Sequence, residues 1–309
     1  MAVFHTTDQL PSFRNAVITI GTFDGVHQGH MMILEEVVRA ARDLNGESIV
    51  ITFEPHPRKL LHPEQALKLI TPLEEKLGLL KQTGIDHVVV APFTREFANL
   101  SAREYIDQFL VKLFHPSCII IGYDHHFGHD RTGNIGLLKQ LESEYKFTVV
   151  EIPAQLIEEA AVSSTKIRKA LQSGQVEEAS SMMGRPYSLR GKVVEGAKLG
   201  RTIGYPTANI QPCDGDQIIP GVGVYAVLVN WKGASHAAML NIGYRPTVTE
   251  ERTLTIEAHL LDFNEDLYGE VLELVFVARL RDELKFSSLE ALKQQLGRDR
   301  EEASKVLGG

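Results

Sequence analysis

Two hydrophobic patterns alternate along the first 183 residues. Short, continuous apolar runs predict buried strands, and between them apolar residues such as Leu34, Val37 and Ala41 recur at helical spacing. Apolar strands that alternate with helices indicate a parallel sheet covered on both faces, in which ligands bind beyond the carboxyl ends of the strands. The predicted strands are Val17–Ile20, Ile49–Phe53, His87–Ala91, Cys118–Ile121 and Phe147–Ile152.

The pattern changes at about Gly184, where short strand-like runs separated by turn residues begin. They predict an antiparallel barrel or sandwich, and "SSLE", with Ser287 and Glu290, predicts a capping box at the start of a last helix. We therefore expect an α/β domain over residues 1–183 and a β domain over residues 184–309, with the junction at 171–184. The predicted strands are Ser188–Val194, Val222–Asn230, Ala237–Ile242, Thr253–Asp262 and Val271–Arg279.

Composition and charge narrow the class of protein. The chain has 309 residues, of which 43% are hydrophobic, and a net charge of −8. Basic residues exceed acidic ones in neither half, which argues against a nucleic-acid partner. The two cysteines lack metal-ligand spacing, and no apolar run approaches about 20 residues. We also expect no signal peptide, because no basic region followed by an apolar stretch is seen near residue 1. We expect a cytoplasmic protein without a membrane partner.

The stretch "GTFDGVHQGH", residues 21–30, directly follows the first predicted strand. Its glycines allow a ligand close to the backbone, and a helix beginning near His30 would point free N–H groups at an anion. His27 and His30 add two further donors. The alternative is a tight turn whose histidines only cap the helix and pack. The three glycines are Gly21, Gly25 and Gly29.

A second candidate anion site, "SSTKIR", spans residues 163–168. The hydroxyls of Ser163, Ser164 and Thr165 would start a helix, and Arg168 could grip a phosphate with two parallel hydrogen bonds. Alone, this segment could be merely a well-capped helix. Together and in this order, the two motifs resemble the nucleotidyltransferases of the His-x-Gly-His superfamily.

Two stretches between these motifs narrow the resemblance. "TFEPHPRK" (52–59) and "GYDHHFGHDRTGN" (122–134) are similar to the adenylyltransferase domain of bacterial bifunctional riboflavin kinase/FAD synthetases. That family often shows Asp-Pro-His-Pro and Gly-x-Asp-Phe-x-Phe-Gly, so Glu54 and His125 are departures. The histidines at 125, 126 and 129 could suggest a metal cluster, but their spacing suits no common metal site.

The family resemblance implies roles for individual residues of the first domain. It implies that His27 and His30 act in catalysis at the triphosphate. The implied nucleotide contacts are Gly21, Phe23, Asp24, Gly25, Gly29, Ser163, Ser164, Thr165 and Arg168. The implied flavin contacts are Phe53, Pro55, His56, Asp124 and Phe127.

In the second half, "GRTIGYPTANI" (200–210) places two oxygen-bearing side chains, Thr207 and Asn209, on the same side of an extended segment. A hydroxyl and an amide oxygen suit a hard cation such as Mg²⁺. The alternative is a turn followed by an edge strand with polar caps. With "GVGVYAV" (221–227), "NIGYRPT" (241–247) and "IEAHLLDFNEDLYGE" (256–270), the segment resembles riboflavin kinase, which has a small antiparallel barrel.

The kinase resemblance also implies site residues. Thr207 and Asn209 would bind Mg²⁺ and ATP phosphate, and Glu257 would be the catalytic base. In its strand Glu257 points opposite to Ile256 and Ala258, so the alternative is an exposed charge on a half-buried strand. Further implied contacts are Gly200, Gly204 and Pro206 to the nucleotide and Arg245 to the flavin.

The predicted architecture is α/β plus β: a Rossmann-like nucleotidyltransferase domain with a parallel sheet, then a small antiparallel β-barrel with a terminal helix. The second domain would phosphorylate riboflavin to FMN, and the first would transfer AMP from ATP to FMN, giving FAD and pyrophosphate. Mg²⁺ would be the cofactor, ATP the co-substrate, and FMN and FAD substrate and product rather than redox cofactors. The sequence leaves the oligomeric state open.

Two alternative functions remain, and the second belongs to a different functional class. One is an adenylyltransferase for a different phosphorylated acceptor, against which the barrel argues. The other is a regulator whose barrel senses flavin without turnover, against which intact Thr207, Asn209 and Glu257 argue.

Overall fold

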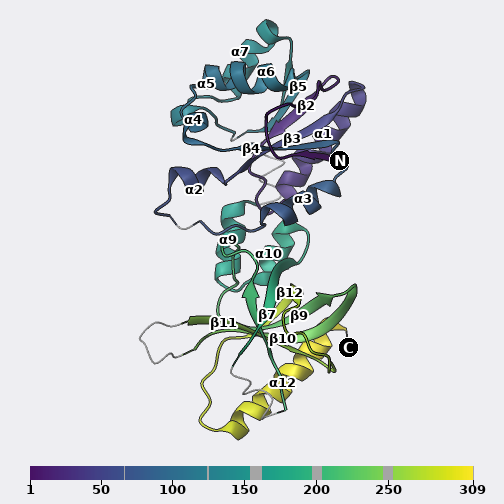
Figure 1. Cartoon of the computed structure of the whole chain (residues 1–309), viewed down its shortest axis with the longest axis vertical. Helices are drawn as coiled ribbons and strands as arrows, with labels where there is room; N and C mark the ends of the chain where they lie inside the picture. Colours follow the sequence, from purple (N-terminus) through teal and green to yellow (C-terminus); the bar gives the residue numbers. More distant parts are fainter. Residues whose placement is uncertain (66, 124, 154–161, 197–203, 246–252, 309) are drawn as a thin grey trace. The chain divides into compact units, whose positions relative to one another are not determined.

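A computed structural model describes residues 1–65, 67–123, 125–153, 162–196, 204–245 and 253–308. The chain divides into two compact units, Met1–Ser163 and Ser164–Gly309, and each is described by itself. Figure 1 shows a helix-covered sheet in the first unit and a barrel in the second.

The first unit is built on a six-stranded sheet in the order β1-β4-β3-β2-β5-β6. All neighbouring strands pair in parallel, which confirms the predicted sheet. β1 was not predicted because three residues are too few to show a hydrophobic period. The strands are β1 (Ala2–Phe4), β2 (Val17–Ile20), β3 (Ser48–Glu54), β4 (His87–Pro92), β5 (Cys118–Gly122) and β6 (Thr148–Ile152).

Helices cover both faces of this sheet, because its continuous apolar strands bury side chains on either side. Ile18 and Ile51 face one core, and Val17 and Val50 face the other. The helical segments are α1 (Gln28–Asp43), α2 (Pro57–Leu61), α3 (Leu73–Lys81), α4 (Arg95–Ala98), α5 (Ala102–Glu104), η1 (Tyr105–Val111), α6 (Lys112–Phe114), η2 (His129–Arg131) and α7 (Ile135–Tyr145).

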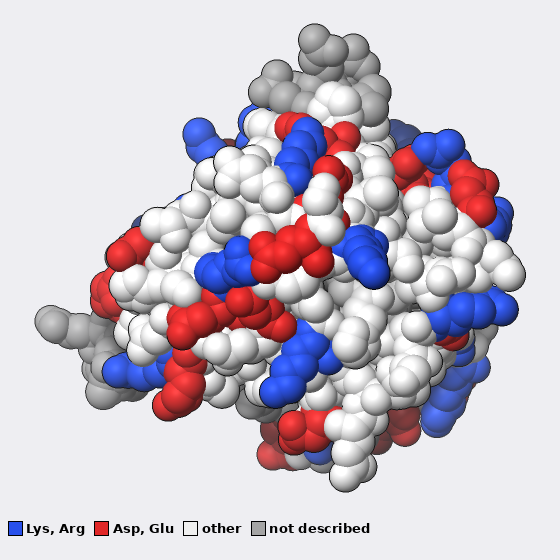
Figure 2. All heavy atoms as spheres, turned by 90° about the horizontal axis from the view of Figure 1, so that it is seen from above, with Lys and Arg blue, Asp and Glu red and all other residues white. Residues whose placement is uncertain are grey.

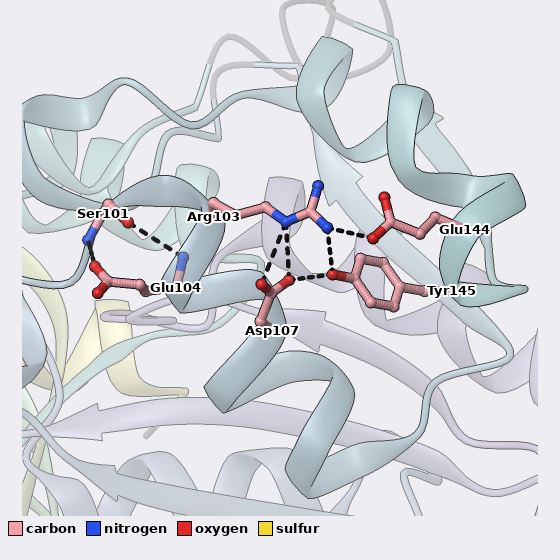
Figure 3. Close-up of polar contacts among 6 residues, drawn as sticks. All are labelled: Ser101, Arg103, Glu104, Asp107, Glu144 and Tyr145. Carbon is pink, nitrogen blue, oxygen red and sulfur yellow. Dashed lines mark hydrogen bonds and ion pairs between the residues drawn. The ribbon is translucent and has the colours of Figure 1, made fainter.

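A polar cluster on the surface joins α5 and η1 to α7 (Figure 3). Arg103 bonds Asp107, Glu144 and Tyr145, and a hydrogen bond to Asp107 raises the pKa of Tyr145 to about 12. The Arg103 side chain is 46% exposed, so solvent screens these interactions and their contribution to stability is small.

The second unit contains a closed antiparallel barrel in the order β10-β11-β8-β7-β12-β9. This confirms the barrel and excludes the sandwich. β8 pairs with β7 on one side and β11 on the other, so the alternative of an edge strand near Asn209 is wrong. The strands are β7 (Tyr187–Val194), β8 (Ala208–Pro212), β9 (Gly223–Trp231), β10 (Ala234–Arg245), β11 (Thr253–Leu260) and β12 (Val271–Arg281).

Among the described residues, the helices of the second unit are α9 (Ser164–Gln172), α10 (Val176–Met183) and α12 (Leu289–Leu307). α10 packs against β7 and β12, so the segment expected to be the junction is largely helical and lies in the second unit. The terminal helix is confirmed, but its predicted cap is wrong. Ser288 caps α12 by accepting from the Ala291 N–H at 3.2 Å, one residue later than expected. None of the helices described combines the length and apolarity required for a membrane span.

Candidate functional sites

The strand order places three candidate segments at one end of the first sheet. β2 lies between β3 and β5, and the chain runs from β2 through β3 to β4 in one direction and from β5 to β6 in the other. This reversal is the topological switch point at which parallel α/β sheets bind ligands. The turn 21–30, the segment 55–59 and the loop 123–134 follow the carboxyl ends of these strands.

The two histidines of the turn lie at the start of α1. His27 is the N-cap residue, and its Nδ1 accepts from the His30 backbone N–H at 3.3 Å. The two rings stack with their centroids 3.6 Å apart. Because Nδ1 accepts, the neutral His27 ring carries its proton on Nε2 and can donate from there. Capping and ligand binding are therefore compatible in the same residue.

The backbone of the turn adopts a rare conformation. φ is 47° at Phe23, 90° at Gly25 and 37° at Val26, and this region is unfavourable for a β-branched residue such as valine. A Cβ at Gly21 would lie 3.1 Å from the Phe23 ring. Such strain persists only where the surrounding structure imposes it, and it is concentrated at ligand-binding sites.

Asp24 supports this turn from inside the protein. It is only 2% exposed and accepts hydrogen bonds from the backbone N–H groups of Ile70 and Thr71, each at 3.0 Å. The Thr71 hydroxyl in turn accepts from the Gly25 N–H at 2.9 Å. These contacts account for the aspartate structurally, and a direct contact to nucleotide stays a prediction.

Lys76 on α3 is a buried residue that the sequence analysis missed. It is 6% exposed, and its Nζ donates to the Thr22 carbonyl at 3.1 Å and the Thr52 hydroxyl at 3.0 Å. Burial lowers the pKa of its ammonium group, while the carboxylates of Asp24 and Glu54 oppose that shift. Its burial could have been predicted from its position in the sequence, because Lys76 lies in the apolar stripe that Leu73, Leu77 and Leu80 define on α3.

The predicted flavin contacts of the first unit lie in different environments. Phe53 and Phe127 belong to a buried aromatic core, where Phe127 stacks on Tyr105 at 5.0 Å. Pro55 is exposed, and His56 is buried as the N-cap of α2. Core packing accounts for the two phenylalanines, so their flavin contacts remain predictions. Asp124 lies outside the described residues.

The second anion motif straddles the two units. Ser163 ends the first unit, and Ser164 begins both α9 and the second unit. Thr165 is exposed and Arg168 is partly buried on α9, while Ile167 and Leu171 are buried. The helix start is confirmed, and the joint action of this motif with the turn 21–30 stays a prediction.

In the barrel, three polar residues lie in a row across neighbouring strands. Glu257 of β11 is opposite Asn209 of β8 and also opposite Asn241 of β10. Ile256 and Ala258 are buried, as predicted, so Glu257 points away from the barrel interior. The Thr207 hydroxyl lies 3.4 Å from Glu257 Oε2. The fold therefore brings the predicted base and one predicted metal ligand together, and aligns the other ligand with them.

Residues that the sequence analysis did not single out hold this arrangement. His259 Nδ1 lies 2.8 Å from the Pro206 carbonyl oxygen, which can only accept, so Nδ1 carries a proton. Its ring also contacts Tyr205, with centroids 5.2 Å apart. A Cβ at Gly196 would lie 1.9 Å from Asn209 Nδ2, so a larger residue there would displace the Asn209 amide. The sequence could have indicated His259, because it lies two residues after Glu257 in the same strand and therefore points to the same side.

A cavity of about 610 Å³ borders Asn209, one residue of this row. Its wall includes Thr207 and Asn209, and the segments 193–196 and 263–268 enclose it further. This volume falls in the range of small-molecule sites. Pro206 also lines the cavity, and both Pro206 and Gly204 are exposed. Gly200 and the side chain of Arg245 lie outside the described structure.

Comparison with known proteins identifies the family. A model of the FAD synthetase family matches residues 10–166, and one of the riboflavin kinase family matches residues 183–307. A bifunctional riboflavin kinase/FMN adenylyltransferase from Listeria monocytogenes is 37% identical, covering 96% of this chain and 94% of its own. This chain belongs to that family. Its Escherichia coli K12 member is 38% identical, covering 98% of this chain and 96% of its own.

The enzyme is thus a riboflavin kinase and an FMN adenylyltransferase, and it uses riboflavin, FMN and ATP. The order of the two family matches confirms that the adenylyltransferase precedes the kinase. A crystal structure described as a macrolide-efflux protein from Streptococcus pneumoniae superposes with a TM-score of 0.86. It is 32% identical and covers 97% of both chains. That description applies to the other protein, and the likeness shows a shared fold.

Proposed function

We propose that the two activities of this riboflavin kinase/FMN adenylyltransferase use two sites in consecutive steps. The barrel face around Glu257 makes FMN, and the turn 21–30 receives the ATP that converts FMN to FAD. The contact between Thr207 and Glu257, in register with Asn209, carries the kinase assignment. We assign the adenylyltransferase to residues 1–183 and the kinase to residues 184–309.

In the kinase step, a hydroxyl of riboflavin attacks the γ-phosphorus of ATP, which gives FMN, and ADP leaves. An alcohol is a poor nucleophile, so removal of its proton by Glu257 accelerates the step, typically by about 10²–10⁴. The oxygens of Thr207 and Asn209 fit Mg²⁺, which prefers oxygen ligands and is usually shared with substrate phosphates. Bound there, Mg²⁺ would neutralise charge on the phosphates.

The adenylyl step makes different demands. The FMN phosphate is already ionised, so its oxygen attacks the α-phosphorus of ATP without a base, and pyrophosphate leaves. Alignment of the reactants and stabilisation of the phosphate charge supply the catalysis. His27, His30 and the N–H groups at the start of α1 are suitable donors for this purpose. The segment 163–168 would add Arg168.

We further propose that this enzyme works in the cytoplasm, where ATP is supplied, with small molecules as its partners. On the face in Figure 2, lysine and arginine mix with aspartate and glutamate, and the side chains drawn there form no broad basic area. This mixture supports small-molecule rather than nucleic-acid partners. The oligomeric state stays open.

Separate measurement of the two reactions over a range of Mg²⁺ tests these assignments. FMN formed from riboflavin, and FAD formed from supplied FMN, are separated by chromatography. Thr207→Ala and Asn209→Ala should raise the Mg²⁺ concentration required for FMN formation and leave that for FAD formation unchanged. An unchanged Mg²⁺ requirement for the kinase would remove both residues from the proposed metal site.

A further inference from the structure

Lys76 forms hydrogen bonds near the carboxyl ends of two adjacent strands, β2 and β3, next to the turn 21–30. Its ammonium group donates to the carbonyl of Thr22, the second residue after β2, and to the hydroxyl of Thr52 in β3. The Thr52 hydroxyl also donates to the Thr22 carbonyl at 3.1 Å. The three groups therefore form a closed hydrogen-bonded triangle, of which only Lys76 comes from outside the sheet and its turn.

Burial of a lysine at this position is unfavourable unless something compensates it. Removing an ammonium group from water carries a large desolvation penalty. The other members of the stripe, Leu73, Leu77 and Leu80, are apolar, and a methionine at position 76 would continue that stripe at no such cost. Hydrophobic replacement of buried charges is often neutral or stabilising, so packing alone does not account for a lysine here.

The contacts of Lys76 bear on the strained part of the turn. Thr22 directly precedes Phe23, the first residue with a left-handed backbone, and Val26 is the last. Asp24 and Gly25, which lie between them, are held by Thr71. Hydrogen bonds from residues 70–76 therefore stabilise both the beginning and the middle of the turn. These are the parts whose backbone conformation must be maintained for a ligand to bind.

Lys76 also affects the charge of the site. Asp24 places a buried carboxylate inside a turn to which we assign the phosphates of ATP, and an uncompensated carboxylate there would repel them. The Lys76 ammonium group is hydrogen-bonded to the Thr22 carbonyl, two residues before Asp24, and the carboxylates of Asp24 and Glu54 both favour its charged form. The positive charge of Lys76 offsets that repulsion in an environment where water screens little.

We propose that Lys76 is a positioning residue of the FMN adenylyltransferase site, which shapes the turn 21–30 for the ATP phosphates and offsets the charge of Asp24. The inference rests on the proposed assignment of that turn to ATP. Lys76 acts through Thr22 and Asp24 and need not touch the nucleotide. The substrates, the chemistry of the step and the kinase site are unaffected by it.

The test measures FAD formation from FMN over a range of ATP concentrations. Lys76→Met removes the charge at similar length and should lower kcat/KM for ATP about 10- to 100-fold, the usual effect of a lost charged hydrogen bond, mainly through KM. Lys76→Arg keeps the charge and should recover most of the loss. Lys81→Met, at an exposed position of the same helix, is the matched control and should resemble the parent.

The split between KM and kcat separates positioning from stability. A purely structural role would reduce the fraction of active molecules and so lower kcat with an unchanged KM for ATP, which would overturn the proposal. So would parent values for both constants. If Lys76→Met does not fold, Thr52→Val removes one partner only and should still raise KM for ATP by about 3- to 10-fold.

A double variant tests the charge argument. Asp24→Asn removes the carboxylate charge but keeps an oxygen acceptor for the N–H groups of Ile70 and Thr71. Combined with Lys76→Met, it removes both charges of the pair. The KM for ATP of the double variant should fall below that of Lys76→Met alone, and a further rise would overturn the charge compensation. If His30→Ala forms FAD normally, the assignment of the turn itself is wrong. If His30→Ala loses FAD formation but Lys76→Met does not, only the role of Lys76 is wrong.

Discussion

The two proposed ATP sites of this enzyme differ in what faces the ligand. In the first unit, a main-chain turn and the start of a helix face the ligand. Buried groups that include Asp24 and Lys76 stabilise this turn through hydrogen bonds. In the barrel, the ligand faces a row of side chains on the outward face of paired strands, with Glu257 beside Thr207. The first site relies on backbone shape, and the second on the register of strands.

This difference follows from the chemistry of the two steps. Transfer to an ionised phosphate requires donors in fixed positions, which a rigid turn supplies without a base. Transfer to an alcohol requires a base next to the metal and phosphate ligands, and antiparallel register can place residues distant in sequence side by side. Substitutions should therefore separate the two activities cleanly.

The largest separation is expected for Glu257→Gln. FMN formation should fall by about 10²–10⁴ because the alcohol loses its base. FAD formation from supplied FMN should stay at the parent rate. Both products are measured by chromatography in one preparation, so the second reaction controls for the amount of intact enzyme. Normal phosphorylation of riboflavin by this variant would exclude Glu257 as the base.

The converse separation is expected for His30→Ala. FAD formation should fall by about 10²–10³, the typical effect of one lost donor to a developing charge, while FMN accumulates from riboflavin. Arg168→Ala should give the same pattern if its guanidinium serves the same triphosphate. Loss of FMN formation in the Arg168 variant alone would instead connect that residue with the barrel, the unit that contains α9.

Two fragments of the chain test at which residue the folding unit of the kinase begins. A fragment of residues 164–309 should fold and phosphorylate riboflavin, because α9 and α10 lie within its compact unit. A fragment of residues 184–309 lacks the buried side chains of Leu171, Val176 and Met183. It should melt at least about 10 °C lower, since each such side chain contributes about 1.5–3 kcal/mol. Equal melting temperatures, measured by circular dichroism, would show that the two helices are dispensable.

A smaller effect is expected at His259, which holds the segment before Thr207. His259→Phe keeps a ring against Tyr205 but loses the bond to the Pro206 carbonyl, and should lower kinase kcat/KM about 3- to 10-fold. His259→Asn offers a donor near the position of Nδ1 and should restore part of the rate. If the Phe variant matches the parent while FAD formation is also normal, the bond to Pro206 does not position Thr207.

Much of this enzyme could be predicted from local patterns in its sequence. Continuous apolar strands alternating with helices indicated the parallel sheet, and alternating burial indicated that Glu257 points away from Ile256 and Ala258. Both properties depend on residues two to four apart, which one element determines by itself. The motifs of the two families also lie within single turns or strands, so they could be read without a structure.

Only the tertiary structure decided which distant residues support each site. Lys76 is 54 residues from Thr22, and the chain brings them together through α3 and the neighbouring ends of β2 and β3. Asn241 is placed opposite Glu257 by strand pairing. Gly196 lies close to the side chain of Asn209. Sequence periodicity shows which side of an element is buried, but not which element lies against it. For that reason the sequence could suggest candidate reacting groups, but not the distant residues that contact them.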